Sequence, residues 1–597
     1  MPVTTSYPGV YLEELPSTTH SVVAAATSNA AIIDWFPQGP IDQAVQITSL
    51  NQFNAIFGGV AFGGIVEGSE GSYAVQQFFL NGGSTIWVVR VVPAGGGSPP
   101  GTPAVPAVMS LPLVASPPLS YPYASVFAVN PGSWGNNLSI GLNVQPAPNN
   151  QSPSNSQLYT LQVGSTLLPA TPSSPAVLET YYNVSLNPSD PSFVASVVNG
   201  VSQYVTVTIP AAPSPLTSPP DLASPPVLPP TGSPPAPEVW TALTDGLDGN
   251  WAPDGSDFAS AIEAQLVPGN STPVPGSITP FLNLIAPQVF NILLVPAAAI
   301  LLSEASQAVI TAGIAYCQYN QAFFVIDPPP PSTIVQNQVQ TASYPWLTSP
   351  PPPPSTQFVN PGPGDTDILA WVSSNNYVSS ANYSAATYYP WLSIPDPANN
   401  FQPRLVGPSG TIAGIYASND FNQGVWTAPA GTNAVLQGAT LTTALNDADS
   451  GILNPQGINV LRSFPIYGNI VWGARTLAGA DLLQSQWKYI NVRRLTDFIE
   501  QSLMQSLKWA VFQPNAAPLW SSITMEVTSF LSGLFAQGAF QGTSAAQAYF
   551  VQCDGTTTTP QNILNGVVNV VVGFAPVFPA EFIILQIELM LGQPQAA

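Results

Sequence analysis

The stretch FNILLVPAAAILLSEASQAVITAGIAYCQYNQAFFVI, residues 290–326, decides the fold class of this 597-residue chain. Residues 290–295 and 322–326 are short apolar runs typical of buried strands, and residues 303–320 between them have the length of a helix. Two strands joined by a helix most simply pair in parallel, because parallel neighbours need a long crossover connection and a helix supplies it. The stretch therefore predicts a βαβ unit, and the fold class is predicted to be α/β (mixed α+β) and multidomain.

Proline-rich stretches separate this unit from the segments around it. The chain contains 68 prolines, about twice the share of roughly 5% found in ordinary proteins. They concentrate in residues 93–122, 210–237 and 328–363, where we expect polyproline II conformation and semi-rigid connectors. Residues 123–209 alternate short apolar and polar runs, which predicts strands.

The charge content excludes nucleic-acid binding and a phosphate-binding loop. Lys and Arg number 8 against 30 Asp and Glu, so the net charge is −22 and 6% of the residues are charged. Nucleic-acid binding depends on basic side chains that neutralise phosphates. Lys488 and Lys508 are the two lysines, and neither lies in the Gly-Lys-Ser/Thr sequence of a phosphate-binding loop.

Residue types that carry catalysis or bind metals are scarce. His20 is the single histidine, and Cys317 and Cys553 are too few for a four-thiolate zinc site. We expect both cysteines to be buried as small apolar residues. The sequence therefore predicts no catalytic residue, no cofactor and no metal site.

An acidic loop, LTDGLDGNWAPDGSDF at 243–258, leaves two interpretations open. Its four aspartates, Asp245, Asp248, Asp254 and Asp257, could supply oxygen ligands to Ca²⁺, although their spacing differs from that of an EF-hand loop. The alternative is a turn in which Asp and Gly satisfy the backbone and cap a helix that begins at Asp257.

No targeting or membrane-spanning segment is predicted. Residues 1–16 lack the basic and apolar regions of a secretory signal. The longest apolar stretches, 289–302 and 563–589, contain Asn, Pro or Glu and fall short of the ~20 clean apolar residues that a spanning helix needs. We expect assembly in the cytoplasm, no secretion signal and no direct membrane insertion.

Motifs distributed in order over the whole chain resemble those of one known family. They include YPGVYLEELPS (7–17), SYAVQQFFLNGGSTIWVVRVV (72–92), GPSGTIAGIYASNDFNQGVWTAPAG (407–431), GTSAAQAYFVQCD (542–554) and GFAPVFPAEFI (573–583). With these motifs the chain resembles the contractile tail sheath proteins of phages and of phage-tail-like contractile injection systems. The proline-rich runs depart from the family pattern.

The resemblance implies a structural protomer and not an enzyme. Such a protomer polymerises as stacked hexameric rings around an inner tube and contracts to drive the tube through a target envelope. The implied partners are copies of itself, the inner tube protein, and baseplate and terminal cap proteins. The implied location is a phage virion tail or a phage-tail-like particle (cytoplasmic, membrane-anchored or released). The alternatives are a surface adhesin or S-layer-like structural protein, and a carboxylate-dependent glycan hydrolase.

The resemblance also implies an inner domain built from both chain ends, with outer domains inserted between them. For this chain the predicted parts are an N-terminal arm (1–19), the first part of the inner sheath domain (20–92), a proline-rich, β-rich outer insert (93–237), an α/β insert with a proline-rich end (238–366), the C-terminal part of the inner domain (367–570) and a C-terminal arm (571–597).

Both arms carry short strand patterns. An isolated strand leaves its backbone groups unpaired, so each arm is expected to join a sheet. The resemblance implies that the sheet belongs to a neighbouring subunit, which would link copies by strand addition; the alternative is a sheet of the same subunit. The arm residues singled out for this role are Val10, Tyr11 and Leu12 at one end and Ile583, Leu585 and Ile587 at the other.

Residues 496–511 predict an amphipathic helix next to a basic cluster. Phe498, Ile499, Leu503, Leu507 and Ala510 recur at helical spacing, and Asp497 and Glu500 are expected in the first turn. The resemblance implies that such a helix contacts the tube through Arg493, Arg494 and Lys508, with Lys488 as a weaker candidate. The alternative is that the arginines pair with carboxylates of their own domain.

The segment GNIVWGARTLAG, residues 468–479, predicts close backbone packing around a multi-donor side chain, Arg475. Its role is predicted to lie at the subunit interface. The alternative is that Arg475 satisfies carbonyls within its own domain.

Overall fold

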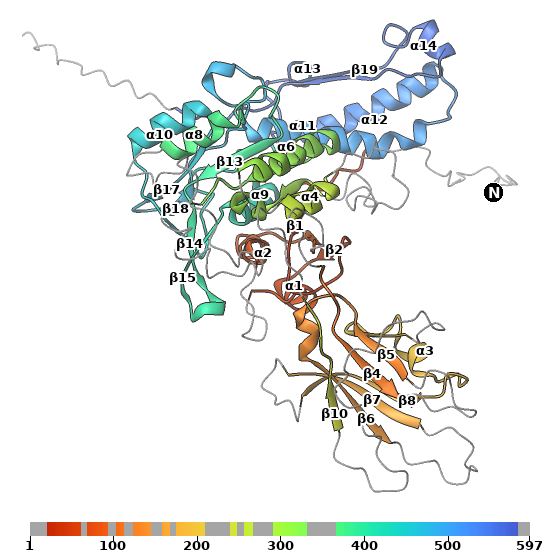
Figure 1. Ribbon diagram of the computed structural model, residues 1–597. Coiled ribbons are helices and arrows are strands. Elements are labelled where there is room, and N and C mark those ends of the chain that lie inside the picture. The colour runs from red at the N-terminus through yellow and green to blue at the C-terminus, as the bar shows by residue number, and fades with distance from the viewer. Residues whose placement is uncertain are drawn as a thin grey trace, which may run out of the picture. The chain divides into compact units, whose positions relative to one another are not determined.

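The computed structural model describes residues 21–60, 69–92, 103–112, 123–144, 158–166, 175–208, 239–247, 256–266, 290–301, 303–330 and 366–582. The chain divides into two compact units, and Figure 1 labels many of their elements. The larger unit lies within residues 26–422 and 428–490. The smaller unit lies within residues 1–25, 423–427 and 491–597.

An eight-stranded sheet forms the centre of the larger unit, in the order β18-β17-β13-β12-β11-β1-β3-β2. The six inner strands are mutually parallel. The two edge strands run antiparallel to their neighbours: β18 pairs with β17, and β2 pairs with β3. The strands are β1 (Ala30–Asp34), β2 (Ala44–Ile47), β3 (Ile86–Arg90), β11 (Ile292–Leu294), β12 (Phe323–Ile326), β13 (Ala385–Tyr389), β17 (Asn459–Phe464) and β18 (Gly468–Val471).

Helices cover both faces of this sheet, because its inner strands are apolar on both faces. In β1, Ala31 and Ile33 belong to one core and Ala30 and Ile32 to the other, as the alternation of side chains along a strand requires. The first core includes residues of α4 (Ser256–Gln265), α6 (Ser303–Asn320), α8 (Thr366–Ser374) and α10 (Asp447–Leu453). The second includes residues of α1 (Leu50–Phe57), α2 (Glu70–Leu80) and α9 (Ser409–Gln423).

A second, smaller sheet contributes to the second core through Leu392, Ile394 and Val406. Its strand order is β15-β14-β16. The strands are β14 (Leu392–Asp396), β15 (Gln402–Val406) and β16 (Thr440–Leu441).

A β-rich lobe of the larger unit has a core of its own, in which Ile140, Leu161 and Val207 are buried. One of its sheets has the order β10-β6-β7-β8 and the other β4-β5-β9. The elements are β4 (Val108–Pro112), β5 (Tyr123–Ala128), β6 (Leu138–Val144), β7 (Leu158–Ser165), β8 (Ala176–Ser185), α3 (Val194–Val198), β9 (Val205–Thr208) and β10 (Val239–Ala242).

The smaller unit consists of helices and a two-stranded ribbon. Leu495, Phe498, Val527 and Leu531 are buried in its core. The N–H groups of Val23 and Ala25 donate to the hydroxyls of Ser506 and Ser502, each at 2.9 Å, so residues 23–25 run beside α11. The elements are α11 (Ile490–Ser506), a 3-10 turn (Leu507–Ala510), α12 (Ala517–Ala536), α13 (Ala545–Ala548), β19 (Tyr549–Gln552), α14 (Pro560–Leu564) and β20 (Val571–Phe574).

The α/β prediction for residues 290–326 is confirmed. The predicted helix coincides with α6, and its flanking strands β11 and β12 pair in parallel. Cys317 and Cys553 are both buried. The strands predicted within 123–209 are likewise present.

Two features predicted from the sequence are wrong. Residues 238–366 do not form a separate α/β insert, because β11 and β12 lie in the same sheet as β1 and β13. The helix predicted at 496–511 begins earlier, at Ile490, so Asp497 and Glu500 lie in its interior and not in its first turn. The helix dipole therefore gives no reason for their positions.

The acidic loop is described in part. Asp257 lies in the first turn of α4, as the capping interpretation expects, and its Oδ1 accepts the N–H of Phe258 at 2.8 Å. Asp248 and Asp254 lie outside the described residues. Calcium binding by the loop stays a prediction.

Candidate functional site

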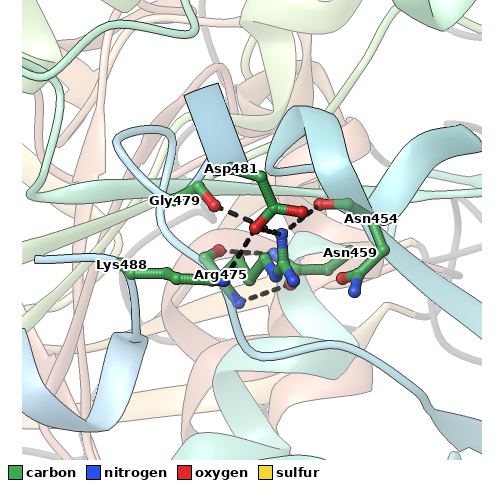
Figure 2. A network of polar contacts seen from close by, with 6 residues as sticks. All are labelled: Asn454, Asn459, Arg475, Gly479, Asp481 and Lys488. Atoms are coloured by element: carbon green, nitrogen blue, oxygen red, sulfur yellow. Dashed lines mark hydrogen bonds and ion pairs between the residues drawn. The ribbon is translucent and has the colours of Figure 1, made fainter. Parts of the chain in front are cut away.

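Arg475 lies at the centre of a polar network in the loop that precedes α11 (Figure 2). Its side chain is fully buried. Nη1 donates to the carbonyl of Asn454 at 2.8 Å, to the carbonyl of Gly479 at 3.4 Å and to Oδ1 of Asp481 at 3.0 Å. One guanidinium thus joins two backbone segments and a carboxylate by charge-assisted hydrogen bonds, which fixes the path of the loop.

Asn459 of β17 holds the backbone of the same arginine. Its Oδ1 accepts the N–H of Arg475 at 2.7 Å, and its Nδ2 donates to the carbonyl of Arg475 at 2.7 Å and to that of Thr387 at 3.2 Å. The side chain is fully buried, so these bonds satisfy its amide. Asn459 is not singled out by the sequence motifs above; its signal is one amide side chain between the apolar residues Ile458 and Val460.

Asp481 connects the buried part of the network to solvent, since its side chain is 49% exposed. Its carboxylate lies between Arg475 and Lys488 in Figure 2, and Lys488 Nζ is 2.7 Å from Oδ1. The hydrogen bond from Lys488, together with the charge of Arg475, lowers the pKa of Asp481 below its usual value. The geometry matches the alternative in which Arg475 satisfies carbonyls of its own domain. A role for Arg475 at a subunit interface stays a prediction.

Arg493 pairs with acids of its own helix. Its Nε donates to Oδ1 of Asp497 at 3.0 Å, its Nη2 contacts the same oxygen, and Nη2 lies 3.3 Å from Oε2 of Glu500. Burial raises the pKa of Asp497 to about 7, against the opposing effect of the Arg493 guanidinium. Arg494 is also buried, and its charge acts on Asp497 in the same direction as that of Arg493. The alternative of pairing within the domain therefore describes Arg493.

Lys508 differs from the other basic residues. It is exposed, and within the described residues it forms no ion pair. By contrast, Arg404 is paired with Glu70 and Arg462 with Asp447. Arg90 is fully buried and donates to backbone carbonyls. Of the four residues predicted to face a tube, Lys508 is therefore the one with a free, solvent-facing charge.

The carboxyl ends of the parallel strands carry two buried acids, at the place where open α/β sheets often bind ligands. Asp34, at the end of β1, accepts the N–H of Gly71 at 2.6 Å. Asp327, after β12, accepts the N–H of Ser409 at 2.7 Å and its hydroxyl at 2.5 Å. Burial raises the pKa of Asp34 well above its usual value and that of Asp327 to about 7. Both carboxyl groups are thus bonded to the first turns of α2 and α9, which identifies them as structural groups.

Neither a metal cluster nor a membrane span is found in the described part of the chain. Its His, Cys, Asp and Glu residues form no group of three or more that could hold a metal ion. None of its helices combines the length and the apolar character needed to cross a bilayer.

Two family models match the chain. Residues 275–477 match the phage tail sheath protein central domain, and residues 484–590 match the phage tail sheath C-terminal domain. Together the matches cover more than half of the chain. The chain belongs to the phage tail sheath protein family. This family consists of structural tail proteins, which confirms the prediction that the chain is not an enzyme.

Individual sheath proteins are similar over limited regions of sequence. The chain is 30% identical over 162 residues to the tail sheath protein of Enterobacteria phage T4, an alignment that covers 27% of this chain and 23% of the T4 protein. It is 28% identical over 168 residues to the tail sheath protein of Vibrio phage KVP40, which covers 28% of this chain and 24% of that protein. The aligned region thus spans about a quarter of the length of these curated relatives.

Solved structures of contractile tails share the fold over nearly the full chain. A chain in the structure of the anti-feeding prophage baseplate in the contracted state is 18% identical, with a TM-score of 0.52 and coverage of 98% of this chain and 99% of that one. A sheath tail protein from Listeria innocua is 11% identical, with a TM-score of 0.50 and coverage of 93% and 96%. These matches confirm the mixed α/β fold class.

The region that matches the sheath C-terminal domain contains a two-stranded ribbon, formed by β19 and β20. β19 and β20 pair in antiparallel fashion, and in the described part of the chain no third strand joins them. Phe550 and Val571 on this ribbon are 56% and 44% exposed. The arm residues predicted to form intersubunit strands, Val10, Tyr11, Leu12, Ile583, Leu585 and Ile587, lie outside the described residues.

Proposed function

We propose that the chain is the structural protomer of a contractile sheath, which stacks with copies of itself as hexameric rings around an inner tube and contracts to drive the tube through a target envelope. The observation that carries this proposal is the match of two successive sheath family models over more than half of the chain. Assembly in the cytoplasm, as part of a phage tail or a phage-tail-like particle, belongs to the same proposal.

The surface supports assembly into a polymer. Several large apolar side chains among the described residues are highly exposed to solvent. Their exposed fractions include 90% for Phe421, 86% for Ile466, 89% for Leu482, 102% for Phe512 and 80% for Leu564. Large apolar side chains that are exposed in a single copy can become buried when copies assemble. Extensive contact between copies is the simplest use of such a surface in a chain with 6% charged residues.

The open ribbon supports strand addition as the link between copies. A two-stranded ribbon is marginal in water by itself and gains stability from further strands. We propose that the terminal arms of neighbouring copies pair with the edges of β19 and β20, through backbone hydrogen bonds that need no particular side chain. Such links would keep copies connected while each protomer moves nearly as a rigid body during contraction.

Electron microscopy of negatively stained protein tests the arms. Deletion of residues 1–19 or 580–597 is expected to abolish sheath tubes while the protomer keeps its circular dichroism spectrum. A sharper test compares two substitutions at one position, Leu585→Pro and Leu585→Thr. Proline removes one backbone hydrogen-bond donor, whereas threonine keeps that donor and is favourable in a strand. Normal tubes from the proline variant would contradict strand addition. Discrete, non-polymeric particles from the wild-type chain would count against the sheath proposal.

We propose Lys508 as the leading contact to an acidic inner tube protein, followed by Arg494, Arg493 and Lys488. The free charge of Lys508 can pair with a tube carboxylate without breaking a bond inside the protomer. By contrast, charge reversal at Arg493 would also leave the buried carboxylate of Asp497 without its ion-pair partner. Exposed pairs contribute about 0–1 kcal/mol each, which suits a contact that is made in arrays and released during contraction.

Co-expression with the tube protein tests this assignment. Lys508→Glu is expected to give sheaths that lack tubes or contract early, whereas Lys508→Gln should have a smaller effect and Arg462→Glu none on tube filling. Tube-filled, extended particles at normal yield from Lys508→Glu would remove Lys508 from the tube contact. We propose the baseplate and terminal cap proteins as further partners at the two ends of the polymer.

A further inference from the structure

A cavity in the smaller unit is bordered by a buried carboxylate with an unused oxygen. Glu526 of α12 lines the cavity and is 5% exposed. Its Oε2 accepts the indole N–H of Trp509 at 2.9 Å, whereas its Oε1 is buried and has no hydrogen-bond partner. A buried carboxylate oxygen without a partner is costly, so a donor is expected at this place.

The face of α12 that contains Glu526 forms one wall of the cavity. Glu526, Phe530 and Gly533 line the cavity, and they follow one another at the spacing that places side chains on one helix face. A glycine inside a helix is unfavourable relative to alanine, so it usually has a packing or functional reason. Among the described residues no neighbouring atom lies within 4 Å of the place that a Cβ of Gly533 would take. Gly533 therefore leaves open space beside the glutamate and does not serve a close contact.

The other walls of the cavity are mainly aromatic and apolar. They include Trp426, Phe498 and Leu534, and the ring centroids of Phe498 and Phe530 lie 6.0 Å apart. The cavity volume is about 380 Å³, which is at the lower end of the range for small-molecule sites. Such sites combine apolar walls with a few polar groups, and Glu526 is the one charged residue among the described lining residues. The cavity thus suits a small group with an apolar stem and a hydrogen-bond donor.

A cationic donor suits this site better than a neutral one. An ionised carboxylate only accepts hydrogen bonds, and the bonds that it accepts from a charged donor are the stronger ones. Aromatic faces also attract cations. Within the described residues no lysine or arginine pairs with Glu526: Arg493 is bonded to Asp497, and Lys508 forms no ion pair. The described part of the chain therefore does not supply this cation.

We propose that the cavity binds a primary alkylammonium group, which donates to Oε1 of Glu526 while its alkyl stem lies against the aromatic walls. The last torsion of a glutamate side chain is broad, so the carboxylate can turn its unpaired oxygen toward a donor that enters the cavity. The residues of the site belong to one unit of one chain, so the site does not depend on the proposed sheath function. A small free amine and a lysine side chain of another protein share this chemistry, and two probes separate them.

Ligand-observed nuclear magnetic resonance on the unassembled full chain tests the site. The first probe is n-butylammonium, which is compared with its neutral counterpart n-butanol at constant ionic strength. We expect saturable binding of n-butylammonium with a dissociation constant on the order of 1 mM, and binding of n-butanol that is at least about tenfold weaker. The second probe is Nα-acetyl-lysine amide. Binding of both amines would show that a lysine side chain can enter the site, whereas binding of n-butylammonium alone would identify a small free amine as the ligand.

Two substitutions separate the role of the carboxylate from that of the space beside it. Glu526→Gln keeps an acceptor for Trp509 and should weaken n-butylammonium binding at least about tenfold, because a charge-assisted hydrogen bond is lost. Gly533→Leu fills the open space, keeps the carboxylate and should abolish binding without a loss of thermal stability. Glu304→Gln, on α6 of the larger unit, is the matched control and should leave the affinity unchanged.

The wild-type titration is decisive even if a variant fails to fold, which circular dichroism reports. Equal affinity for n-butylammonium and n-butanol, or no saturable binding of n-butylammonium, would overturn the proposed cation site. So would an unchanged affinity for n-butylammonium in folded Glu526→Gln or folded Gly533→Leu protein, because the amine would then bind elsewhere.

Discussion

Replacement of Arg475 by methionine should open the loop between Ala474 and Ile490. Methionine fills the space of the aliphatic stem but cannot donate to the carbonyls of Asn454 and Gly479, which are 2.8 and 3.4 Å from Nη1. A buried acceptor left without a donor costs about 1–3 kcal/mol, and the longer bond to Gly479 places that part at the low end. The half-exposed carboxylate of Asp481 adds little. The expected loss is about 3 kcal/mol of local stability.

Hydrogen exchange measured by mass spectrometry on unassembled protein checks this value. The amides of Thr476, Gly479 and Ile490 are bonded within the loop to the carbonyls of Lys488, Thr476 and Ala474 at 3.0, 2.8 and 3.0 Å. A loss of about 3 kcal/mol should speed their exchange about 100-fold. Asp481→Asn, which alters the exposed end of the network, is the matched control and should speed exchange less than about fivefold. Equal effects of both variants, or no effect of Arg475→Met, would refute the view that the buried carbonyl contacts hold the loop.

Two further outcomes follow from the packing and the buried acids. Gly410→Ala should lower stability by about 1–3 kcal/mol in thermal melts, because its Cβ would lie 2.3 Å from the carbonyl oxygen of Ala74; Gly533→Ala, with nothing within 4 Å, should raise it by about 0.5–1 kcal/mol. Equal changes in stability for Gly410→Ala and Gly533→Ala would contradict the close approach of α9 to α2. The folded-state pKa of Asp327, about 7, lies above its unfolded value, so this group stabilises the fold most below pH ~4 and loses that effect as the pH rises to about 7. The melting temperature should therefore fall less between pH 5 and 7 in Asp327→Asn than in the wild type, and parallel curves would contradict this role.

Local patterns in the chain were sufficient to identify many of the elements. Residues 303–320 form α6 because their 18 residues suit a helix and the runs on either side suit buried strands. The amphipathic pattern of Phe498, Ile499 and Leu503 likewise predicted α11 and the side that it buries. The ordered motifs at both chain ends were sufficient to identify the sheath family.

Contacts that reach across the chain could not be read from such patterns. β11 pairs with β1, and β12 with β13, although each pair is separated by a long stretch of chain, so the boundary predicted at residue 238 was wrong. Asn491, in the first turn of α11, donates from Nδ2 to the carbonyls of Trp426 and Val577 at 2.8 and 2.9 Å. A local pattern does not contain these partners.

The sequence alone determined the composition, the acidic charge, the absence of a two-histidine or four-cysteine site, the local elements and the family. The tertiary structure decided which basic side chains are already used: Arg475 and Arg493 are buried and paired, whereas Lys508 stands free in solvent. The physical reason is that helical and strand periodicity is set by neighbours within a few residues. Whether a charge is paired, desolvated or available to a partner depends on groups brought together by folding.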